Sequence, residues 1–240
     1  MTPVESYASS VETLRRVAVH IVARARQQAT GRFGLRATPG GFGTPEFGSD
    51  LRRVRVSGGL LIVEVGAADG ARCSAMPIDG ATLSVLAAFV GVDLDRELSV
   101  GGDTPAVGPT DIALVLDDAD ASRVAATYSL TMAVLDRTIA GVAEGKSALP
   151  QLWPEHFDLG VDFDAGGGRR VNLGGSPGDG FSTDPYLYVG PWGTERPGDS
   201  SFWNAPFGAV LAVDAFDHAE DGQVGRGVEF FRQGLAKFAR

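Results

Sequence analysis

Apolar side chains recur at three- and four-residue steps in three long stretches of the chain. This spacing places them on one face of a helix, so it predicts amphipathic helices over residues 5–28, 120–143 and 224–238. The stripe of the first helix comprises Tyr7, Val11, Leu14, Ala18, Ile21 and Ala25. A shorter apolar run between Asp79 and Gly91 predicts a short helix with Asp79 as its N-cap and Gly91 at its end.

Between these helices the pattern changes to short runs bounded by glycine and proline, which is typical of strands. The predicted strands cover residues 52–56, 60–65, 72–77, 157–163, 170–173, 186–189 and 209–213. The first three are joined by the turns Ser57–Gly59 and Ala68–Gly70, so they predict an antiparallel meander. Residues 30–48 are rich in glycine, proline and phenylalanine, which predicts a short strand running into an ordered loop.

The order of these elements indicates the fold class. Helices at both ends with hairpins between them favour an α+β fold, a mostly antiparallel sheet covered by helices, over alternating βαβ units. A chain of 240 residues buries roughly 70–75% of its unfolded surface, so it needs no disulfide or structural metal. No segment has the composition of a linker. The sequence therefore predicts one α+β domain over residues 1–240.

The charge and the cysteine content restrict the partners and the compartment. A net charge of −9 and a pI near 4.8 argue against a nucleic-acid or anionic-membrane partner, which would need a basic surface. Residues 1–28 carry charged and polar groups throughout, with no apolar core of a signal peptide. The single cysteine, Cys73, cannot form an internal disulfide, and we expect it to be buried. A cytoplasmic protein without a cofactor is expected.

The segment Gly174–Gly178 matches the Gly-x-Ser-x-Gly motif of α/β-hydrolases, and Asp214 and His218 follow in the matching order. In that motif the residue after the serine donates its backbone N–H to the oxyanion hole. Here that residue is Pro177, which has no N–H. Ser176 is therefore expected to be a turn serine and not a nucleophile.

An acidic cluster surrounds one histidine in the second half of the chain. On a strand over 157–163, two-residue alternation would place Phe157, Leu159, Val161 and Phe163 on one face. The opposite face would carry His156, Asp158, Asp162 and Asp164. This arrangement makes His156 a candidate base or ligand-orienting group, with Asp158 or Glu155 as its partner. The alternative is a half-buried strand whose polar face lies in water. No third metal ligand is identifiable, so no metal site is predicted.

Aromatic residues and prolines concentrate between residues 152 and 207, which include all three tryptophans. Amphipathic rings suit the walls of a ligand pocket or a protein interface. The candidate ligand contacts are Trp153, Tyr186, Tyr188, Trp192, Trp203 and Asn204. The competing explanation is that long loops use such residues to pin themselves onto the sheet.

Several of these segments resemble a family of uncharacterised actinobacterial proteins: Gly31–Pro45, Leu152–Leu159, Gly175–Asp179, Pro185–Trp192 and Trp203–Ala209. The order of His156–Leu159, Pro177–Asp179, a Tyr-x-Tyr pair and Trp203 is more remotely similar to a bacterial domain of unknown function. The resemblance implies a bacterial, cytoplasmic, single-domain protein. Neither family brings an assigned reaction, cofactor or catalytic residue.

Two functions of different classes follow from these features. The first is a small-molecule binding protein or enzyme whose ligand lies between the His156/Asp158 strand and the aromatic loops. The alternative is a protein-interaction or self-association module, a homo-oligomer among its forms, that uses the same aromatic loops. The sequence does not decide whether the chain is an enzyme.

Overall fold

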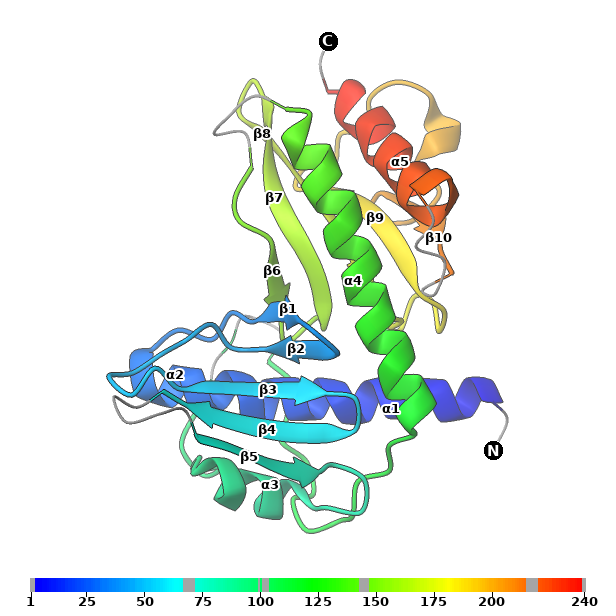
Figure 1. The fold of residues 1–240 in the computed structure, drawn as a ribbon. Coiled ribbons are helices and arrows are strands. Elements are labelled where there is room, and N and C mark those ends of the chain that lie inside the picture. Colours follow the sequence, from blue (N-terminus) through cyan, green and yellow to red (C-terminus); the bar gives the residue numbers. More distant parts are fainter. Residues whose placement is uncertain are drawn as a thin grey trace. The chain divides into compact units, whose positions relative to one another are not determined.

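The computed structural model describes residues 3–66, 72–98, 100, 104–142, 147–214 and 220–238 (Figure 1). The chain divides into two compact units. Unit 1 comprises Met1–Ala125 and Leu152–Phe157, and unit 2 comprises Ala126–Gln151 and Asp158–Arg240. The predicted class, α+β with antiparallel strands and helices, is confirmed, but two five-stranded sheets replace the one sheet expected. That residues 1–240 form one domain stays a prediction.

The first predicted helix is continuous but not uniform. It consists of α1 (Pro3–Val17), the π-helical segment η1 (Ala18–Ala23) and α2 (Arg24–Thr30). The whole predicted stripe from Tyr7 to Ala25 is buried, and η1 contacts β2 of unit 1. His20 lies in η1 and is buried; this burial, with a contribution from the charge of Arg24, lowers its pKa to about 4. The imidazole is therefore neutral at physiological pH.

The sheet of unit 1 has the order β1-β2-β3-β4-β5, with every pair antiparallel. Its strands are β1 (Arg36–Thr38), β2 (Gly41–Gly43), β3 (Arg53–Ser57), β4 (Leu60–Val65) and β5 (Arg72–Pro77). The last three confirm the predicted meander. β1 and β2 form a hairpin around Gly40, whose φ of 78° favours glycine. Residues 30–48 therefore contain two strands, whereas one strand and a loop were predicted. The predicted turn Ala68–Gly70 lies outside the described residues.

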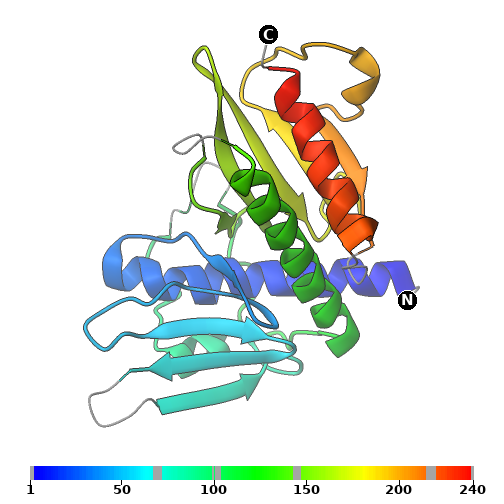
Figure 2. The ribbon, with the colours of Figure 1, turned by 45° about the horizontal axis from the view of Figure 1, so that its top comes forward.

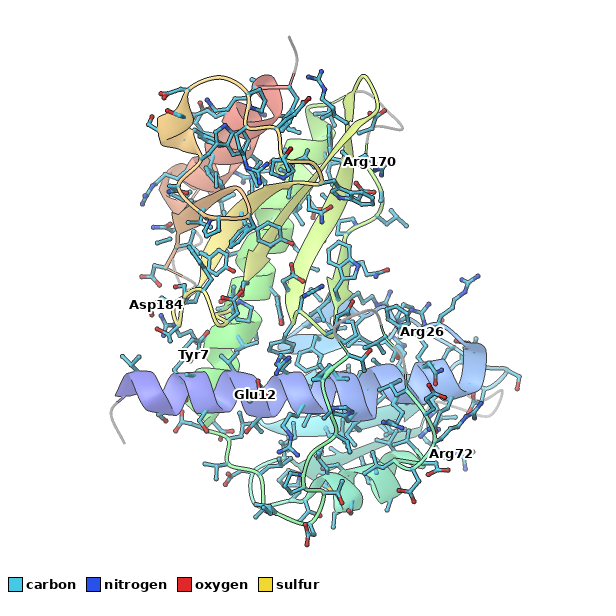
Figure 3. All side chains as sticks on the ribbon, turned by 180° about the vertical axis from the view of Figure 1, so that it is seen from behind. Tyr7, Glu12, Arg26, Arg72, Arg170 and Asp184 are labelled. Atoms are coloured by element: carbon cyan, nitrogen blue, oxygen red, sulfur yellow. The ribbon has the colours of Figure 1, made fainter. Side chains whose placement is uncertain are left out.

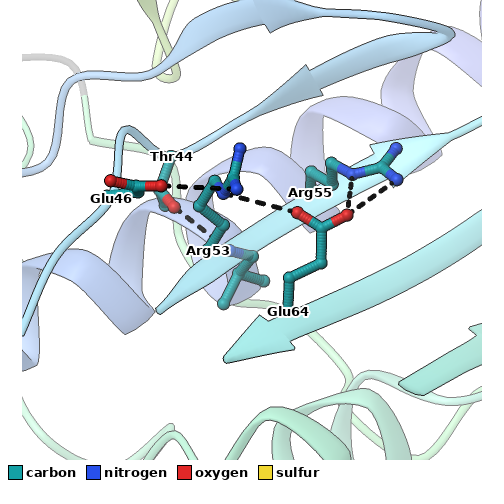
Figure 4. A network of polar contacts seen from close by, with 6 residues as sticks. Thr44, Glu46, Arg53, Arg55 and Glu64 are labelled. Carbon is teal, nitrogen blue, oxygen red and sulfur yellow. Dashed lines mark hydrogen bonds and ion pairs between the residues drawn. The ribbon is translucent and has the colours of Figure 1, made fainter. Parts of the chain in front are cut away.

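Charged side chains on β3 and β4 form a polar network (Figure 4). The carboxylate of Glu64 accepts a hydrogen bond from Arg55 Nε at 3.0 Å and lies 3.5 Å from Arg53 Nε. Arg53 Nη2 also lies 3.3 Å from Glu46 Oε1, and Thr44 Oγ1 accepts a hydrogen bond from the Val54 N–H at 3.1 Å. Because the ion pairs are partly exposed, each contributes little to stability.

Two details of unit 1 correct the sequence-based expectations. The N-cap of α3 (Leu83–Val90) is Thr82, whose hydroxyl accepts from the Val85 N–H at 3.2 Å. Asp79 instead accepts from the Leu116 N–H at 3.0 Å, so it fixes a neighbouring segment. Cys73 was expected to be buried but is exposed. It lies on β5, which is at the edge of the sheet and is mostly exposed to solvent.

The sheet of unit 2 has helices on one of its faces (Figure 2). The strand order is β10-β9-β8-β7-β6. The strands are β6 (Gln151–Trp153), which was not predicted, β7 (Asp158–Gly166), β8 (Arg169–Ser176), β9 (Tyr186–Pro191) and β10 (Ala209–Ala212). Of β6, only Gln151 belongs to unit 2, whereas Leu152 and Trp153 belong to unit 1. The helices are α4 (Asp118–Ala140) from Ala126 onward and α5 (Gly225–Ala236). Short segments are η2 (Ser200–Phe202) and η3 (Glu220–Val224).

The two predicted helices pack on this sheet through one apolar core. Helix α4 contributes Leu130, Val134 and Leu135, α5 contributes Val228 and Phe231, and the strands contribute Val161, Leu173, Leu187 and Val189. The predicted end of α4, Ala143, lies outside the described residues. Close packing depends on Gly175, because a Cβ there would lie 2.3 Å from Thr131 Oγ1 on α4. The adjacent glycines of the Gly-x-Ser-x-Gly segment therefore have a packing role.

Candidate functional site

We call the face of the unit 2 sheet that points away from α4 and α5 the outer face; Arg170 is labelled on it in Figure 3. Four of the nine predicted site residues lie on this face: Asp158, Tyr186, Tyr188 and Trp192. On β7, Leu159, Val161 and Phe163 are buried while Asp158, Asp162 and Asp164 are only half-buried, as the alternation predicts. The register pairs Asp162 with Asn172 of β8, and Asn172 with Gly190 of β9. The outer face therefore carries the even-numbered residues of all three strands.

The predicted strand began too early in the chain. Phe157 has a φ of 55°, so it lies in a turn, and β7 starts at Asp158. Phe157 is buried in unit 1 against Phe42, with ring centroids 5.3 Å apart, and His156 is exposed. His156 and Glu155 thus belong to unit 1 and Asp158 to unit 2. Their pairing as catalytic groups stays a prediction.

Two tyrosine–aspartate pairs occupy one end of the outer face. The Tyr188 hydroxyl donates to Asp158, and the Tyr186 hydroxyl donates to Asp179 Oδ2 at 2.5 Å. The two rings are neighbours, with centroids 6.5 Å apart. The ring of Tyr188 crosses β8 directly over Gly174, where a Cβ would lie 2.6 Å from its hydroxyl oxygen. The sequence predicted three of these residues as site residues, and the structure brings them together.

Both phenols are poor acids in this environment. Burial raises the pKa of Tyr186 far above its ordinary value of 10.0, and the hydrogen bond to Asp179 raises it further. Burial also raises the pKa of Tyr188, with an added contribution from the charge of Asp158. A phenolate beside a carboxylate in a buried place is strongly disfavoured. Both hydroxyls therefore remain protonated donors at physiological pH.

The Tyr186–Asp179 pair also anchors the connection between β8 and β9. Asp179 Oδ1 accepts the backbone N–H groups of Phe181 at 2.8 Å and Ser182 at 3.2 Å. Ser176 is buried and accepts the Gly178 N–H at 3.1 Å, which is the geometry of a turn serine. His218, the histidine of the rejected triad, lies outside the described residues. These hydrogen bonds fasten the loop between β8 and β9 to this end of the outer face.

The other end of the outer face presents an exposed aromatic ring. The side chain of Trp192 is 64% exposed, and its Nε1–H donates to Asn172 Oδ1 at 2.9 Å. The guanidinium of Arg170 lies 5.6 Å from the centroid of the Trp192 ring. Asp162 holds this guanidinium through two hydrogen bonds, one of them 2.8 Å long, and the bonding raises the pKa of Arg170. Trp192 is therefore held in one orientation although it is exposed.

The remaining predicted site residues lie elsewhere. Trp203 packs on the helix side of the sheet, 6.0 Å from the Phe238 ring, and donates to the Pro197 carbonyl at 3.1 Å. Asn204 is exposed and exchanges two hydrogen bonds with the backbone of Val210, which fastens its loop to β10. In unit 1, Trp153 is half-buried on β6, and the Glu155 carbonyl accepts from Arg15 at 3.3 Å.

Three residues of the outer face were missed as site candidates. Asn172 and Arg170 lie two residues apart on the predicted strand 170–173, so their alternation with Val171 and Leu173 was a usable signal. Asp179 gave only the signal of a turn residue in Ser-Pro-Gly-Asp. Its bond to Tyr186 joins a loop to a strand and could not be read from local spacing.

Further chemistry on the described residues is limited. Within the described ranges, no three histidine, cysteine, aspartate or glutamate side chains are grouped to hold a metal ion. No helix among the same residues combines the length and apolarity needed to cross a membrane. The comparisons with known proteins found no matching family model, no matching curated protein and no matching solved structure.

Proposed function

We propose that the chain is a small-molecule binding protein whose ligand stacks on Trp192 at the outer face of β7, β8 and β9. The observation that carries this proposal is that Trp192 is 64% exposed yet fixed by Asn172 and Arg170. Because the indole is exposed to water, its contacts with Asn172 and Arg170 contribute little to the stability of the fold. A ring that is already oriented lowers the entropy cost of binding a ligand.

The surroundings of Trp192 favour a ligand with one apolar ring face and polar edges, such as a sugar or a cyclic polyol. Gly190 precedes Trp192 on the same face and is half-buried; it carries no side chain, as is common where a ligand approaches a strand closely. The Asn172 amide and the Asp162–Arg170 pair supply hydrogen-bonding groups beside the ring. Asp158, Asp162 and Asp164 on this face disfavour polyanions such as nucleic acids.

Titration with a panel of sugars and cyclic polyols tests this proposal. The chain has three tryptophans, so nitrogen–proton correlation spectra contain three indole signals, and that of Trp192 is assigned by its loss in Trp192→Phe. A binding compound is expected to shift the Trp192 signal. Trp192→Ala should then weaken binding at least tenfold, which corresponds to about 1.4 kcal/mol.

Trp153→Phe in unit 1 is the matched control and should bind as the wild type does. Since the Trp192 side chain is mostly exposed, Trp192→Ala should unfold at nearly the wild-type denaturant concentration. A panel that leaves both the Trp192 signal and the melting temperature unchanged would contradict the proposal.

The alternative function, self-association through the aromatic loops, is favoured by one separate observation. Phe181 is 46% exposed and Phe207 38% exposed, and their rings are neighbours with centroids 5.2 Å apart. Exposed aromatic pairs of this kind are enriched at protein interfaces. If this pair forms a self-association surface, light scattering should give an oligomer for the wild type and a monomer for Phe181→Ser/Phe207→Ser. A monomeric wild type at high concentration would count against this function.

We also propose, from the sequence, a cytoplasmic protein without nucleic-acid partners. The pairing of His156 with Asp158 or Glu155 as catalytic groups carries no part of the binding proposal. Mutation of His156 to alanine is therefore expected to leave binding at Trp192 unchanged.

A further inference from the structure

A groove on the helix side of unit 2 is separate from the outer face and from Trp192. It has a volume of about 780 Å³ and is lined by Arg169, Pro197, Gly198, Asp199, Gln233, Ala236 and Lys237. Sites for small ligands commonly have volumes of roughly 300–1,000 Å³. The groove therefore has room for a small organic molecule.

Two cations flank this groove. Lys237 follows the end of α5, and its ammonium lies 4.6 Å from the centroid of the Phe202 ring. Arg169 donates from Nε to the Gly166 carbonyl at 3.2 Å and from Nη2 to the Phe238 carbonyl at 2.7 Å. These bonds orient the guanidinium and use two of its five N–H groups. Both cations keep donors for a further acceptor.

Among the residues that the structure describes, one carboxylate lines the groove, and it is already engaged. Asp199 accepts hydrogen bonds from the Ser201 N–H at 2.9 Å and the Ser201 hydroxyl at 2.8 Å, which caps η2. These bonds, with a smaller contribution from the charge of Lys237, lower the pKa of Asp199. The described lining residues, Arg169, Lys237 and Asp199, thus carry an excess of one positive charge in a chain whose net charge is −9. This local excess favours an anionic ligand.

The loop that lines one side of the groove is held by aromatic side chains next to it. Trp203 donates to the carbonyl of Pro197, and its ring meets that of Phe202 edge-on, with centroids 5.0 Å apart. Arg196 lies 5.7 Å from the Trp203 ring centroid on the same loop. Gly198 has a φ of 79°, and a Cβ there would lie 3.5 Å from Lys237 Cγ, so the loop passes close to the lysine stem. These contacts fasten the loop beside Lys237, and an ordered wall lowers the entropy cost of binding a ligand.

We propose that this groove binds a small organic anion, with its charged group between Arg169 and Lys237 and its apolar body along Pro197 and Ala236. The site lies beyond the function proposed for Trp192, since it uses the opposite side of the sheet. The ligand class shares an anionic group, a carboxylate, sulfonate or phosphate, on an apolar body. A long polyanion would not fit a groove with one excess positive charge.

Anilinonaphthalene sulfonate, a fluorescent anion with an apolar body, is a suitable probe for the folded wild-type chain. We expect saturable binding with one site per chain, at least tenfold weaker in Lys237→Gln and restored in Lys237→Arg. Arg226→Gln, which removes the same charge from an exposed position of α5, should bind as the wild type does.

Three results would overturn the proposal: no saturable binding to the wild type, equal affinities for wild type and Lys237→Gln, or weakening by Trp192→Ala instead. Circular dichroism of Lys237→Gln identifies any loss that comes from unfolding. Should that variant unfold, competition between the probe and octanoate on the wild type decides. Displacement by octanoate but not by the uncharged octanol supports the anion site, and equal displacement by both contradicts it.

Discussion

Replacing Gly174 with valine is expected to lower the free energy of unfolding by about 3 kcal/mol. A Cβ at this position would lie 2.6 Å from the Leu159 carbonyl oxygen and 2.7 Å from Tyr188 Cζ. Neither neighbour can move freely: the first is backbone of the adjacent strand, and the second belongs to a buried ring whose hydroxyl is bonded to Asp158. The measurement is urea denaturation followed by circular dichroism.

Gly180→Val is the matched control for this variant. Gly180 lies in the exposed loop between β8 and β9, where no heavy atom is within 4 Å of the added Cβ, so a change within about 0.5 kcal/mol is expected. A double-mutant cycle with Tyr188→Ala separates the two clashes of Gly174→Val. If the ring contributes to the cost, the combined variant should lose less than the sum of the single variants. Additive losses would show that Tyr188 does not oppose a side chain at this position.

Periodicity predicted those elements whose burial follows their own sequence. The stripe of α1 to α2, the meander β3 to β5 and the alternation of β7 are all found in the structure. In each case the local period decides which residues face the core, so neighbouring residues along the chain are sufficient. The same alternation placed Asp158, Asp162 and Asp164 on one polar face, whereas Tyr186 and Tyr188 were selected only because aromatic residues are concentrated in that region.

The errors occur where contacts distant in sequence override the local signal. Asp79 has the chemistry of an N-cap, but its carboxylate bonds to Leu116, and Thr82 caps the helix. Cys73 lies in a predicted strand, yet its exposure depends on the position of β5 at the sheet edge. Phe157 follows the strand alternation in sequence, but its positive φ removes it from the strand. Edge position and positive φ values at residues other than glycine have no local pattern.

Local sequence also failed to predict which residues of the aromatic loops share a site. Trp192 and Trp203 are close in sequence and were predicted to serve one ligand. They lie on opposite sides of the sheet, because Trp192 pairs with Arg170 on the outer face whereas the loop after β9 carries Trp203 to Phe238. Composition identifies a region rich in aromatic residues, but the path of the loop decides which of their rings share a surface.

Alkaline pH is expected to destabilise the fold through Tyr186 and Tyr188. Their pKa values in the folded chain lie above the ordinary value of 10.0, chiefly because both side chains are buried. The folded state therefore binds these protons more tightly than the unfolded state does. This stability is fully present below about pH 10 and is lost as the pH rises toward the folded pKa values. Between about pH 9 and pH 11 the expected loss is about 1.4 kcal/mol for each tyrosine, or about 3 kcal/mol for both.

Tyr186→Phe and Tyr188→Phe provide the control for this pH dependence. Each should lower stability at neutral pH by about 1.5–3 kcal/mol, because a hydrogen bond to a carboxylate is removed. Each should also reduce the loss between about pH 9 and pH 11 by roughly half, since one titrating phenol is gone. Urea denaturation at both pH values measures the loss, and tyrosinate absorbance follows the ionisation itself. If both variants retain the full wild-type loss, other groups govern alkaline unfolding. If tyrosinate instead forms reversibly near pH 10 in the folded wild type, and this signal is missing in either variant, the two phenols are not held protonated by burial.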